Sequence, residues 1–300
     1  MNTTSEIKRI LSKKHKQVAP RGLKVNEYIQ ESIEIDPLNA ISNFESRPFN
    51  FKYFTGEMLW YLCGNFKVDF ISKFSKFWLN IADQNNQINS NYGQIILKQF
   101  KFAYDSLAQD KYTRQAVMTI NESRHQKPTK DFPCTLNLLF FIRDDKLNMR
   151  VQMRSQDIFY GLQYDVPWYS FVHQNMYLLL KKVYPKLELG TYVHYMDNVH
   201  YYERHFELVN KIKKEKSTTF YRFQLLKPII LVKKDKAVVH RDFVAQFQAF
   251  KNDLVDIKSL NFFEYLNSLG FIQIEKFTRV TKPSILTKFK LMLNSVFKLK

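Results

Sequence analysis

Residues 131–166 read DFPCTLNLLFFIRDDKLNMRVQMRSQDIFYGLQYDV, and this stretch decides both fold and chemistry. Two apolar runs, 135–142 and 147–153, are joined by four polar residues, a pattern that predicts a β-hairpin. Cys134 precedes the hairpin and Arg154 follows it, so a thiol and a guanidinium fall within a short stretch of chain. A nearby cation favours the thiolate, which is the reactive form of cysteine. The stretch therefore predicts a nucleophile for covalent attack on an electrophilic ring carbon of an anionic substrate.

The composition predicts one globular domain of ordinary size. A chain of 300 residues with 45% hydrophobic and 16% aromatic residues can bury a substantial core, which excludes a disordered protein. No apolar run is long enough to span a bilayer, and the polar start at residues 1–4 is unlike a signal peptide. The two cysteines, Cys63 and Cys134, do not make a disulfide framework. We therefore expect a reducing, cytoplasmic location, with Cys63 as a small buried hydrophobe.

The net charge of +18 leaves the type of partner open. A strongly basic chain can bind nucleic acid or an anionic membrane surface, and its basic ends would supply such peripheral contacts. Anionic small molecules are another class of partner, because nucleotides and polyglutamylated folates both carry negative charge. The chain is also rich in Lys, Asn, Phe and Ile, as expected from an AT-biased genome. Charge alone decides between none of these alternatives.

Shifts in composition divide the chain into three segments. We expect a basic N-terminal segment at 1–19, a catalytic domain at 20–275 and a basic amphipathic tail at 276–300. The end of that tail, residues 287–300, alternates apolar residues with lysines. Such a segment either lies at a membrane interface or packs as a helix on its own domain or partner, and both alternatives stay open.

Periodicity and end signals predict the main elements of the catalytic domain. Gly64 is placed to end an apolar helix, and Pro167 is placed in the first turn of another. The predicted helices are 5–19, 55–62, 167–184 and 201–214, and the predicted strands outside the hairpin are 190–196 and 227–233.

The order of motifs resembles the thymidylate synthase family. That family carries Pro-Cys, a strand pair, Arg-Ser-x-Asp, Gly-x-Pro-Phe-Asn-Ile, a helix, and a loop with Gly-Asp-x-His-x-Tyr. The corresponding motifs here are Pro133-Cys134, residues 154–157, residues 161–166 and residues 198–202. Several spaced motifs in one order are more specific than any one alone. Over roughly residues 20–235, the resemblance implies an α/β fold with a mixed sheet packed against helices, and a homodimer formed through that sheet.

The resemblance implies a phosphate cradle made of Arg21, Arg154 and Ser155. Guanidinium and hydroxyl donors suit a phosphate dianion, because the guanidinium binds two oxygens at once. Arg114 matches an arginine that reaches the phosphate in the partner subunit's site. The family usually has a second arginine beside it, where this chain has Thr113.

Further substrate contacts are also implied by the resemblance. His200 and Tyr202 match the pair that binds the sugar 3′-hydroxyl. Asp157 matches the acid that holds the pterin of the folate, and Trp78 and Gly161 match residues near the folate.

Glu57 is predicted to be a proton shuttle. It lies in an apolar helix, where burial of a charge is costly and raises the carboxyl pKa toward neutrality. In the family, the glutamate of the Glu-x-x-Trp helix organises water and proton transfer at the base. A helix-surface carboxylate is the alternative.

Asp165 stands where thymidylate synthases carry asparagine. The asparagine amide offers a donor to uracil O4 and an acceptor to N3–H, whereas an ionised aspartate offers acceptors only. Cytosine instead presents an N4 amino donor, and one proton is then shared between its N3 and Asp165. Thiolate addition at C6 makes N3 more basic, so this sharing strengthens toward the transition state. The same residue marks the cytidylate hydroxymethylases of the family, although neutral drift in a uridylate enzyme stays open.

The resemblance implies 5,10-methylenetetrahydrofolate as co-substrate and no metal. Cys134 adds to C6, C5 attacks the one-carbon unit, and the folate departs to leave an exocyclic methylene. Water addition then gives a 5-hydroxymethyl pyrimidine, whereas hydride transfer from the folate gives a methyl group. Asp165 and the basic tail in place of an apolar lid favour cytosine and water.

Our first hypothesis is therefore a (deoxy)cytidylate 5-hydroxymethylase. The alternatives are a thymidylate synthase that methylates dUMP and, from another class, a non-catalytic basic protein that binds nucleic acid or membrane on this scaffold. The sequence does not distinguish ribose from deoxyribose.

Overall fold

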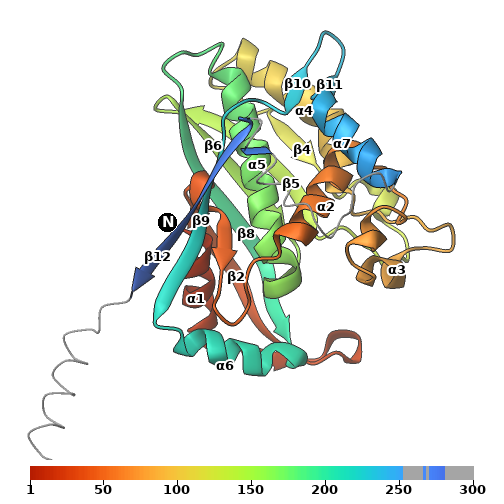
Figure 1. Ribbon diagram of the computed structural model, residues 1–300, viewed down its shortest axis with the longest axis vertical. Coiled ribbons are helices and arrows are strands. Elements are labelled where there is room, and N and C mark those ends of the chain that lie inside the picture. The colour runs from red at the N-terminus through yellow and green to blue at the C-terminus, as the bar shows by residue number, and fades with distance from the viewer. Residues whose placement is uncertain (253–265, 268–269, 281–300) are drawn as a thin grey trace, which may run out of the picture.

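A mixed β-sheet forms the centre of the fold (Figure 1). The computed structural model describes residues 1–252, 266–267 and 270–280. Across the sheet the order in the described part is β1 (Lys16–Val18), β2 (Val25–Ile35), β8 (Glu188–Tyr202), β6 (Lys146–Met153), β5 (Thr135–Arg143) and β4 (Val117–Thr119). Both β6 and the short β7 (Gln156–Asp157) run parallel to β8, and the other neighbours are antiparallel. The expected α/β class with a mixed sheet is confirmed.

One face of this sheet is buried under helices. Alternate residues of a strand point to opposite faces, and on β5 and β6 the apolar set faces the helices. The buried members are Leu138, Phe140, Ile142, Leu147, Met149 and Val151. The helix α5 (Gln163–Leu180) lies against this face in Figure 1, and its His173 Nε2 is 2.8 Å from the Leu147 carbonyl oxygen. The helices α2 (Phe51–Cys63) and α4 (Tyr92–Gln109) pack beside α5 in the core.

The predicted hairpin is confirmed as β5 and β6. Its turn residues Asp144 and Asp145 have φ angles of 50° and 54°. Two successive left-handed residues make a turn whose twist matches the flanking strands, and aspartate tolerates this conformation. Because Thr135 pairs with Met153, the residues just outside the hairpin, Cys134 and Arg154, become neighbours.

The remaining elements cover the edges of the central sheet. A second sheet has the order β12 (Ile272–Val280), β9 (Ser217–Leu225) and β3 (Ile41–Asn43), all antiparallel. The other described elements are α1 (Thr3–Leu11), α3 (Phe77–Ile81), α6 (Phe206–Lys214), α7 (Arg241–Lys251) and the hairpin of β10 (Ile230–Val232) and β11 (Ala237–Val239). In α1 the side chains of Ile7, Ile10 and Leu11 are fully buried.

The predicted strand 190–196 is longer than expected. It begins at Glu188 and continues to Tyr202, so the motif at 198–202 lies in a strand and not in a loop. Pairing with β2 holds this segment extended, since Tyr202 lies opposite Val25. The predicted helix 201–214 is correspondingly shorter and occupies Phe206–Lys214.

The other predicted elements also differ at their ends. The helix expected at 55–62 is confirmed within α2, and Gly64 caps its end. The helix expected at 167–184 begins at Gln163, because a π-helical turn at Ile158–Leu162 runs directly into it and leaves Pro167 inside.

The helix predicted at 5–19 and the strand predicted at 227–233 were both too long. Of the helix predicted at 5–19, residues after Leu11 leave the helix and Lys16–Val18 pairs with β2. The strand predicted at 227–233 is confined to Ile230–Val232. The amphipathic end 287–300 lies outside the described residues, and the three segment boundaries stay predictions. Among the described helices, none combines the length and the apolar character that crossing a membrane requires.

Close contact between α2 and α4 predicts that Gly93→Ala is destabilising. A Cβ atom on Gly93 would overlap the carbonyl oxygen of Tyr61, a backbone atom that cannot rotate away. We expect a loss of about 1–3 kcal/mol in the free energy of unfolding, as for other overpacked cores. Urea denaturation followed by circular dichroism measures the loss. Ser106→Ala on the same helix is the control and should change stability by less than about 0.5 kcal/mol. An unaltered midpoint for Gly93→Ala would contradict this close approach.

Candidate active site

Cys134 and Arg154 meet at the open end of the hairpin. The Sγ atom of Cys134 is 3.7 Å from Nη2 of Arg154. The guanidinium also donates to the carbonyl oxygens of Phe132 at 2.7 Å and Pro133 at 3.0 Å, which fixes its position. From α4, the hydroxyl of Tyr92 accepts a hydrogen bond from the Cys134 amide at 3.1 Å. The nucleophile predicted from sequence is thus held from two sides, and its side chain stays only half-buried.

Burial raises the pKa of Cys134 to about 11. The positive charge of Arg154 acts in the opposite direction, and the carboxyl groups of Asp165, Asp131 and Asp157 raise the pKa further. At neutral pH the resting side chain is therefore the thiol. Arg154 thus acts in the direction expected from the sequence, but desolvation outweighs this single cation.

Glu57 is buried on α2 with one oxygen bonded. The Tyr53 hydroxyl donates to Oε1 at 2.8 Å and itself accepts from Nε1 of Trp78 at 3.2 Å. Oε2 is buried without a hydrogen-bond partner among the described residues. Burial raises the pKa of Glu57 to about 8, the charge of Asp165 adds to the rise, and bonds from Tyr53 and Tyr61 oppose it. The shift has the direction predicted for a proton shuttle.

Asp165 extends from the first turn of α5 toward the same space. Its Oδ2 accepts a hydrogen bond of 2.7 Å from Nε2 of Gln156. Burial raises the pKa of Asp165 to about 7, and Gln156 partly opposes this rise while the charge of Asp157 adds to it. Asp165 and Glu57 are thus two neighbouring carboxyl groups whose pKa values both lie close to neutral pH.

Asp157 and His200 are placed side by side by the parallel pairing of β7 with β8. The Oδ1 atom of Asp157 accepts from the amides of Phe159 and Tyr160 at 2.6 and 2.7 Å, and its Oδ2 is buried without a partner in the described chain. Burial raises the pKa of Asp157 and lowers that of His200. The Nδ1 atom of His200 is 3.0 Å from Oδ1 of Asn198, which orients the ring.

Arg21 lies at the edge of this group. It is exposed in a turn at Pro20–Gly22, with the left-handed φ of 54° that an arginine rarely adopts. Its charge lowers the pKa of His200 and opposes the rise in the pKa of Tyr202, so the three side chains face a common space. The ring of Tyr202 stands edge-on to that of His200 at 5.4 Å.

Three other predicted residues border the same region. Trp78 is buried behind Tyr53, against Trp60 at a ring distance of 5.2 Å. Ser155 is half-buried between Arg154 and Gln156. Gly161 adjoins the Gln156–Asp165 bond, and a Cβ atom there would overlap Nε2 of Gln156.

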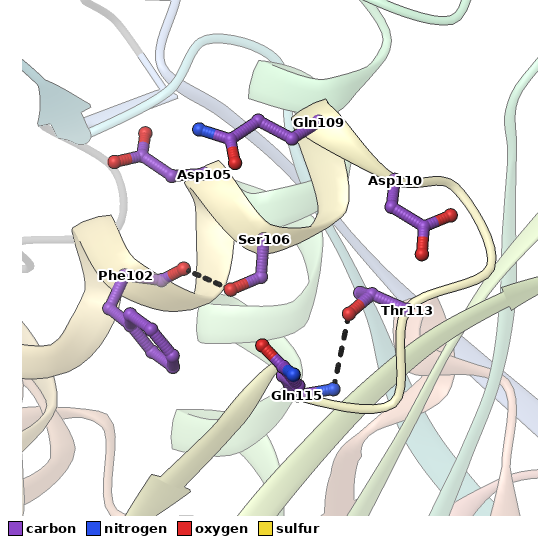
Figure 2. A pocket seen from close by; sticks show the side chains of 7 residues that line it. All are labelled: Phe102, Asp105, Ser106, Gln109, Asp110, Thr113 and Gln115. Carbon is purple, nitrogen blue, oxygen red and sulfur yellow. Dashed lines mark hydrogen bonds between the residues drawn. The ribbon is translucent and has the colours of Figure 1, made fainter.

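Arg114 is not brought to this group within one chain. It is exposed on the loop that follows α4, beside a surface pocket that contains none of the predicted site residues. Figure 2 shows this pocket, where the Ser106 hydroxyl bonds the Phe102 carbonyl and the Gln115 amide bonds the Thr113 hydroxyl. Any role of Arg114 at a substrate phosphate therefore requires a second subunit.

Sequence reasoning missed several residues that hold this site. Tyr53 lies four positions before Glu57 on the same helix face, and that spacing could have identified it. Gln156 stands inside the quoted Arg-Ser-Gln-Asp motif, but its partner Asp165 could not be inferred from the motif. His194, whose Nε2 atom is 3.0 Å from Oε1 of Gln156, comes from a distant segment, and no local signal indicates it. Among the residues that the structure describes, no group of three or more His, Cys, Asp or Glu side chains could hold a metal ion.

The chain is an α/β protein with a central mixed sheet, and it belongs to the thymidylate synthase family of pyrimidine-modifying enzymes. The model of that family matches residues 4–245. The suspected family membership is therefore confirmed.

Curated relatives within that family include phage hydroxymethyltransferases. The chain is 30% identical over 209 residues to the deoxycytidylate 5-hydroxymethyltransferase of Enterobacteria phage T6, covering 63% of this chain and 85% of the relative. The phage T4 protein of the same name is 29% identical over 209 residues with the same coverage. The deoxyuridylate hydroxymethyltransferase of Bacillus phage SP01 is 28% identical over 205 residues, which are 62% of this chain and 52% of that relative.

The bond from Tyr53 predicts that Tyr53→Phe raises the pKa of Glu57 further above its value of about 8. A hydrogen bond to a carboxylate stabilises the charged form, so its loss should raise the pKa by about one unit. Carbon-13 NMR of labelled glutamate side chains measures the titration, with Glu57→Gln to assign the signal. Tyr164→Phe is the matched control, because its ring packs on Tyr53 at 4.8 Å without a bond to Glu57. An unchanged titration in Tyr53→Phe would refute the assignment.

Proposed function

We propose that this protein is a (deoxy)cytidylate 5-hydroxymethylase that uses methylenetetrahydrofolate. Family membership and the names of the relatives support one-carbon transfer to C5 of a pyrimidine. The observation that carries the choice of cytosine is Asp165, an acid where the family's uracil enzymes have asparagine.

The surroundings of Asp165 support a cytosine partner. Its carboxyl group has a pKa of about 7, so one proton is readily shared with a ring nitrogen. Cytosine needs this sharing, since its N3 is an acceptor while its N4 amino group donates. Uracil needs a donor at O4 and an acceptor at N3–H, and the ionised carboxylate offers no donor.

The proposed reaction begins with bond formation between Sγ of Cys134 and C6 of the base, and the thiol proton leaves for a neighbouring acceptor. The negative charge that develops on the ring makes C5 a nucleophile. The methylene carbon of methylenetetrahydrofolate bonds to C5 as its bond to one folate nitrogen breaks. Loss of the C5 proton then accompanies cleavage of its bond to the second folate nitrogen, which releases tetrahydrofolate and leaves an exocyclic methylene. Water adds there, the Sγ–C6 bond breaks, and the products are a 5-hydroxymethyl nucleotide and tetrahydrofolate.

Glu57 is the group best suited to handle the proton and the water. Its pKa of about 8 lets it both give and take a proton near neutrality, and its Oε2 is a buried acceptor without a protein partner in the described chain. A bound water would satisfy that atom and lie within reach of the base.

The proposed folate contact rests, like the role of Glu57, on a buried oxygen without a hydrogen-bond partner in the described chain. Oδ2 of Asp157 is a buried carboxylate oxygen without a partner among the described residues, which fits an N–H donor of a pterin. Trp78 and Gly161 remain proposed members of that region, and His200 and Tyr202 remain proposed sugar contacts. Arg21, Arg154 and Ser155 would hold the phosphate.

If Asp165 reads the base, Asp165→Asn should shift preference from the cytosine to the uracil nucleotide, because the amide provides the donor for O4. We expect the ratio of kcat/KM for the two nucleotides to change by about tenfold or more. Product mass after incubation with methylenetetrahydrofolate and dCMP, CMP or dUMP measures this and identifies the sugar.

Two variants control that assay. Asp144→Asn makes the same chemical change in the exposed hairpin turn and should alter nothing, and Cys134→Ser should abolish all products. Methylated dUMP from the unaltered protein would make it a thymidylate synthase instead. No product from any nucleotide, with salt-sensitive binding to nucleic acid or anionic vesicles, would favour the binding protein on this scaffold.

A homodimer is part of the same proposal. The sheet face opposite α5 carries half-buried or exposed apolar side chains, among them Val117, Leu139, Phe141 and Tyr195, and Arg150 stacks on Tyr195 at 5.0 Å. A second copy would cover this face and bring its Arg114 to the phosphate.

Sharing of sites predicts that two inactive variants restore activity when mixed. Arg114→Ala lacks the cross-subunit arginine and Cys134→Ser lacks the nucleophile, so a mixed dimer has one complete site. Refolding equal amounts together should give about a quarter of the wild-type activity, because half of the dimers are mixed. Each variant refolded alone is the control. No recovery, despite mixed dimers in solution, would refute the cross-subunit role of Arg114.

A further inference from the structure

A row of buried side chains leads from the base-reading position into the core. Nε2 of Gln156 donates to Oδ2 of Asp165 at 2.7 Å. Oε1 of Gln156 is 3.0 Å from Nε2 of His194, and Nδ1 of His194 is 2.6 Å from the Tyr192 hydroxyl. Tyr192 and His194 are completely buried and Gln156 is 2% exposed. Side chains from β7, β8 and α5 thus form one continuous chain of hydrogen bonds.

The hydrogen bonds in this row all run in one donor-to-acceptor direction, from Tyr192 to Asp165. Burial lowers the pKa of His194 to about 3, so the ring is neutral and carries a single N–H. Burial also raises the pKa of Tyr192 well above its ordinary value, so Tyr192 keeps its proton. Because Nε2 of Gln156 donates to Asp165, Oε1 of Gln156 has to accept, which places the N–H of His194 on Nε2 and leaves Nδ1 to accept from the Tyr192 hydroxyl. The N–H of His194 then points at Oε1 of Gln156, and the amide N–H of Gln156 points at Asp165.

The bond from Gln156 restricts where a proton can lie on the carboxyl group of Asp165. An N–H group directed at Oδ2 requires an acceptor there, so a proton on that oxygen is disfavoured. Space for this arrangement depends on Gly161, because a Cβ atom there would overlap Nε2 of Gln156 and lie 3.2 Å from Oδ2 of Asp165. The position between Ser155 and Asp157 is therefore occupied by a side chain that contacts the base-reading acid.

We propose that Gln156 is a specificity-determining positioning residue, which together with His194 and Tyr192 holds Asp165 as a hydrogen-bond acceptor and thereby favours cytosine over uracil. This inference rests on the proposed function, in which Asp165 reads the base. A carboxyl group kept as an acceptor places the shared proton on N3 of cytosine. A carboxyl group that keeps its own proton presents one donor and one acceptor, as asparagine does, and so also accommodates uracil.

Other groups around Asp165 act on its charge as well. From the elements packed against it, the titratable side chains that interact with it are Glu57 and Tyr61 of α2, Tyr92 of α4, Cys134, Asp157 of β7, Tyr169 of α5 and Tyr192 of β8. None of them carries a positive charge. Burial and the charge of Asp157 raise the pKa of Asp165, and the bond from Gln156 lowers it. Removal of that bond should therefore raise the pKa of Asp165.

The test is Gln156→Met, which keeps the length of the side chain and removes the hydrogen bond. We expect the ratio of kcat/KM for the cytosine over the uracil nucleotide to fall by about tenfold, since a bond to a charged group is lost. The alkaline limb of the pH profile for the cytosine nucleotide should shift upward, because Asp165 loses a donor that stabilises its charged form. Tyr192→Phe keeps the core filled and should shift the ratio the same way by less.

Two comparisons separate this role from a structural one. Gln174→Met removes another buried amide, which bonds the Pro37 and Phe223 carbonyls away from the site, and it should leave the ratio unchanged. In an Asp165→Asn background, Gln156→Met should no longer change the ratio, since no carboxyl group remains. The proposal would be overturned if Gln156→Met lowered kcat/KM equally for the cytosine and the uracil nucleotide, both in the wild-type and in the Asp165→Asn background, and left the pH profile unchanged. A failure of Asp165→Asn itself to alter base preference would instead refute the proposed function.

Discussion

Removal of water from a small group of acids is the constraint on which this site depends. Cys134, Glu57 and Asp165 come from three different elements, and burial raises the pKa of each, to about 11, 8 and 7. Because each group adds to the cost of charging its neighbours, the resting site favours protonated forms. Arg154 partly offsets this for the thiol at 3.7 Å. In the proposed reaction, activation of Cys134 as the nucleophile would therefore accompany substrate binding.

The strand β8 links the separate parts of the site. Its outer end holds His200 and Tyr202 beside Asp157, through the parallel pairing with β7. Its middle holds Tyr192 and His194, whose bonds pass through Gln156 to Asp165. One strand thus orients both the proposed sugar contacts and the proposed base contact. A shift in its register would move both sets together, because each successive residue changes face.

Local patterns predicted the parts of the fold in which neighbours along the chain are also neighbours in space. The hairpin between Cys134 and Arg154 and the helix with Glu57 are such parts. The segment 198–202 was expected as a loop from the resemblance and, from 201 on, as a helix from periodicity, because nothing local reveals that β2 pairs with it over its full length. The resting thiol of Cys134 was missed for a related reason. Sequence shows the nearby arginine, but the desolvation comes from distant segments.

The same desolvation reconciles a group of acids with an anionic substrate. A nucleotide phosphate would be repelled if Glu57, Asp157 and Asp165 were all ionised. In a site of low dielectric this repulsion would be large. The raised pKa values reduce the negative charge that Glu57 and Asp165 carry before binding, and in the proposed function Arg21 and Arg154 attract the phosphate. The cost is that a proton has to move during the reaction. Groups with a pKa of about 7 and 8 make that movement easy near neutral pH, so burial that hinders the resting thiolate also supports the later proton transfers.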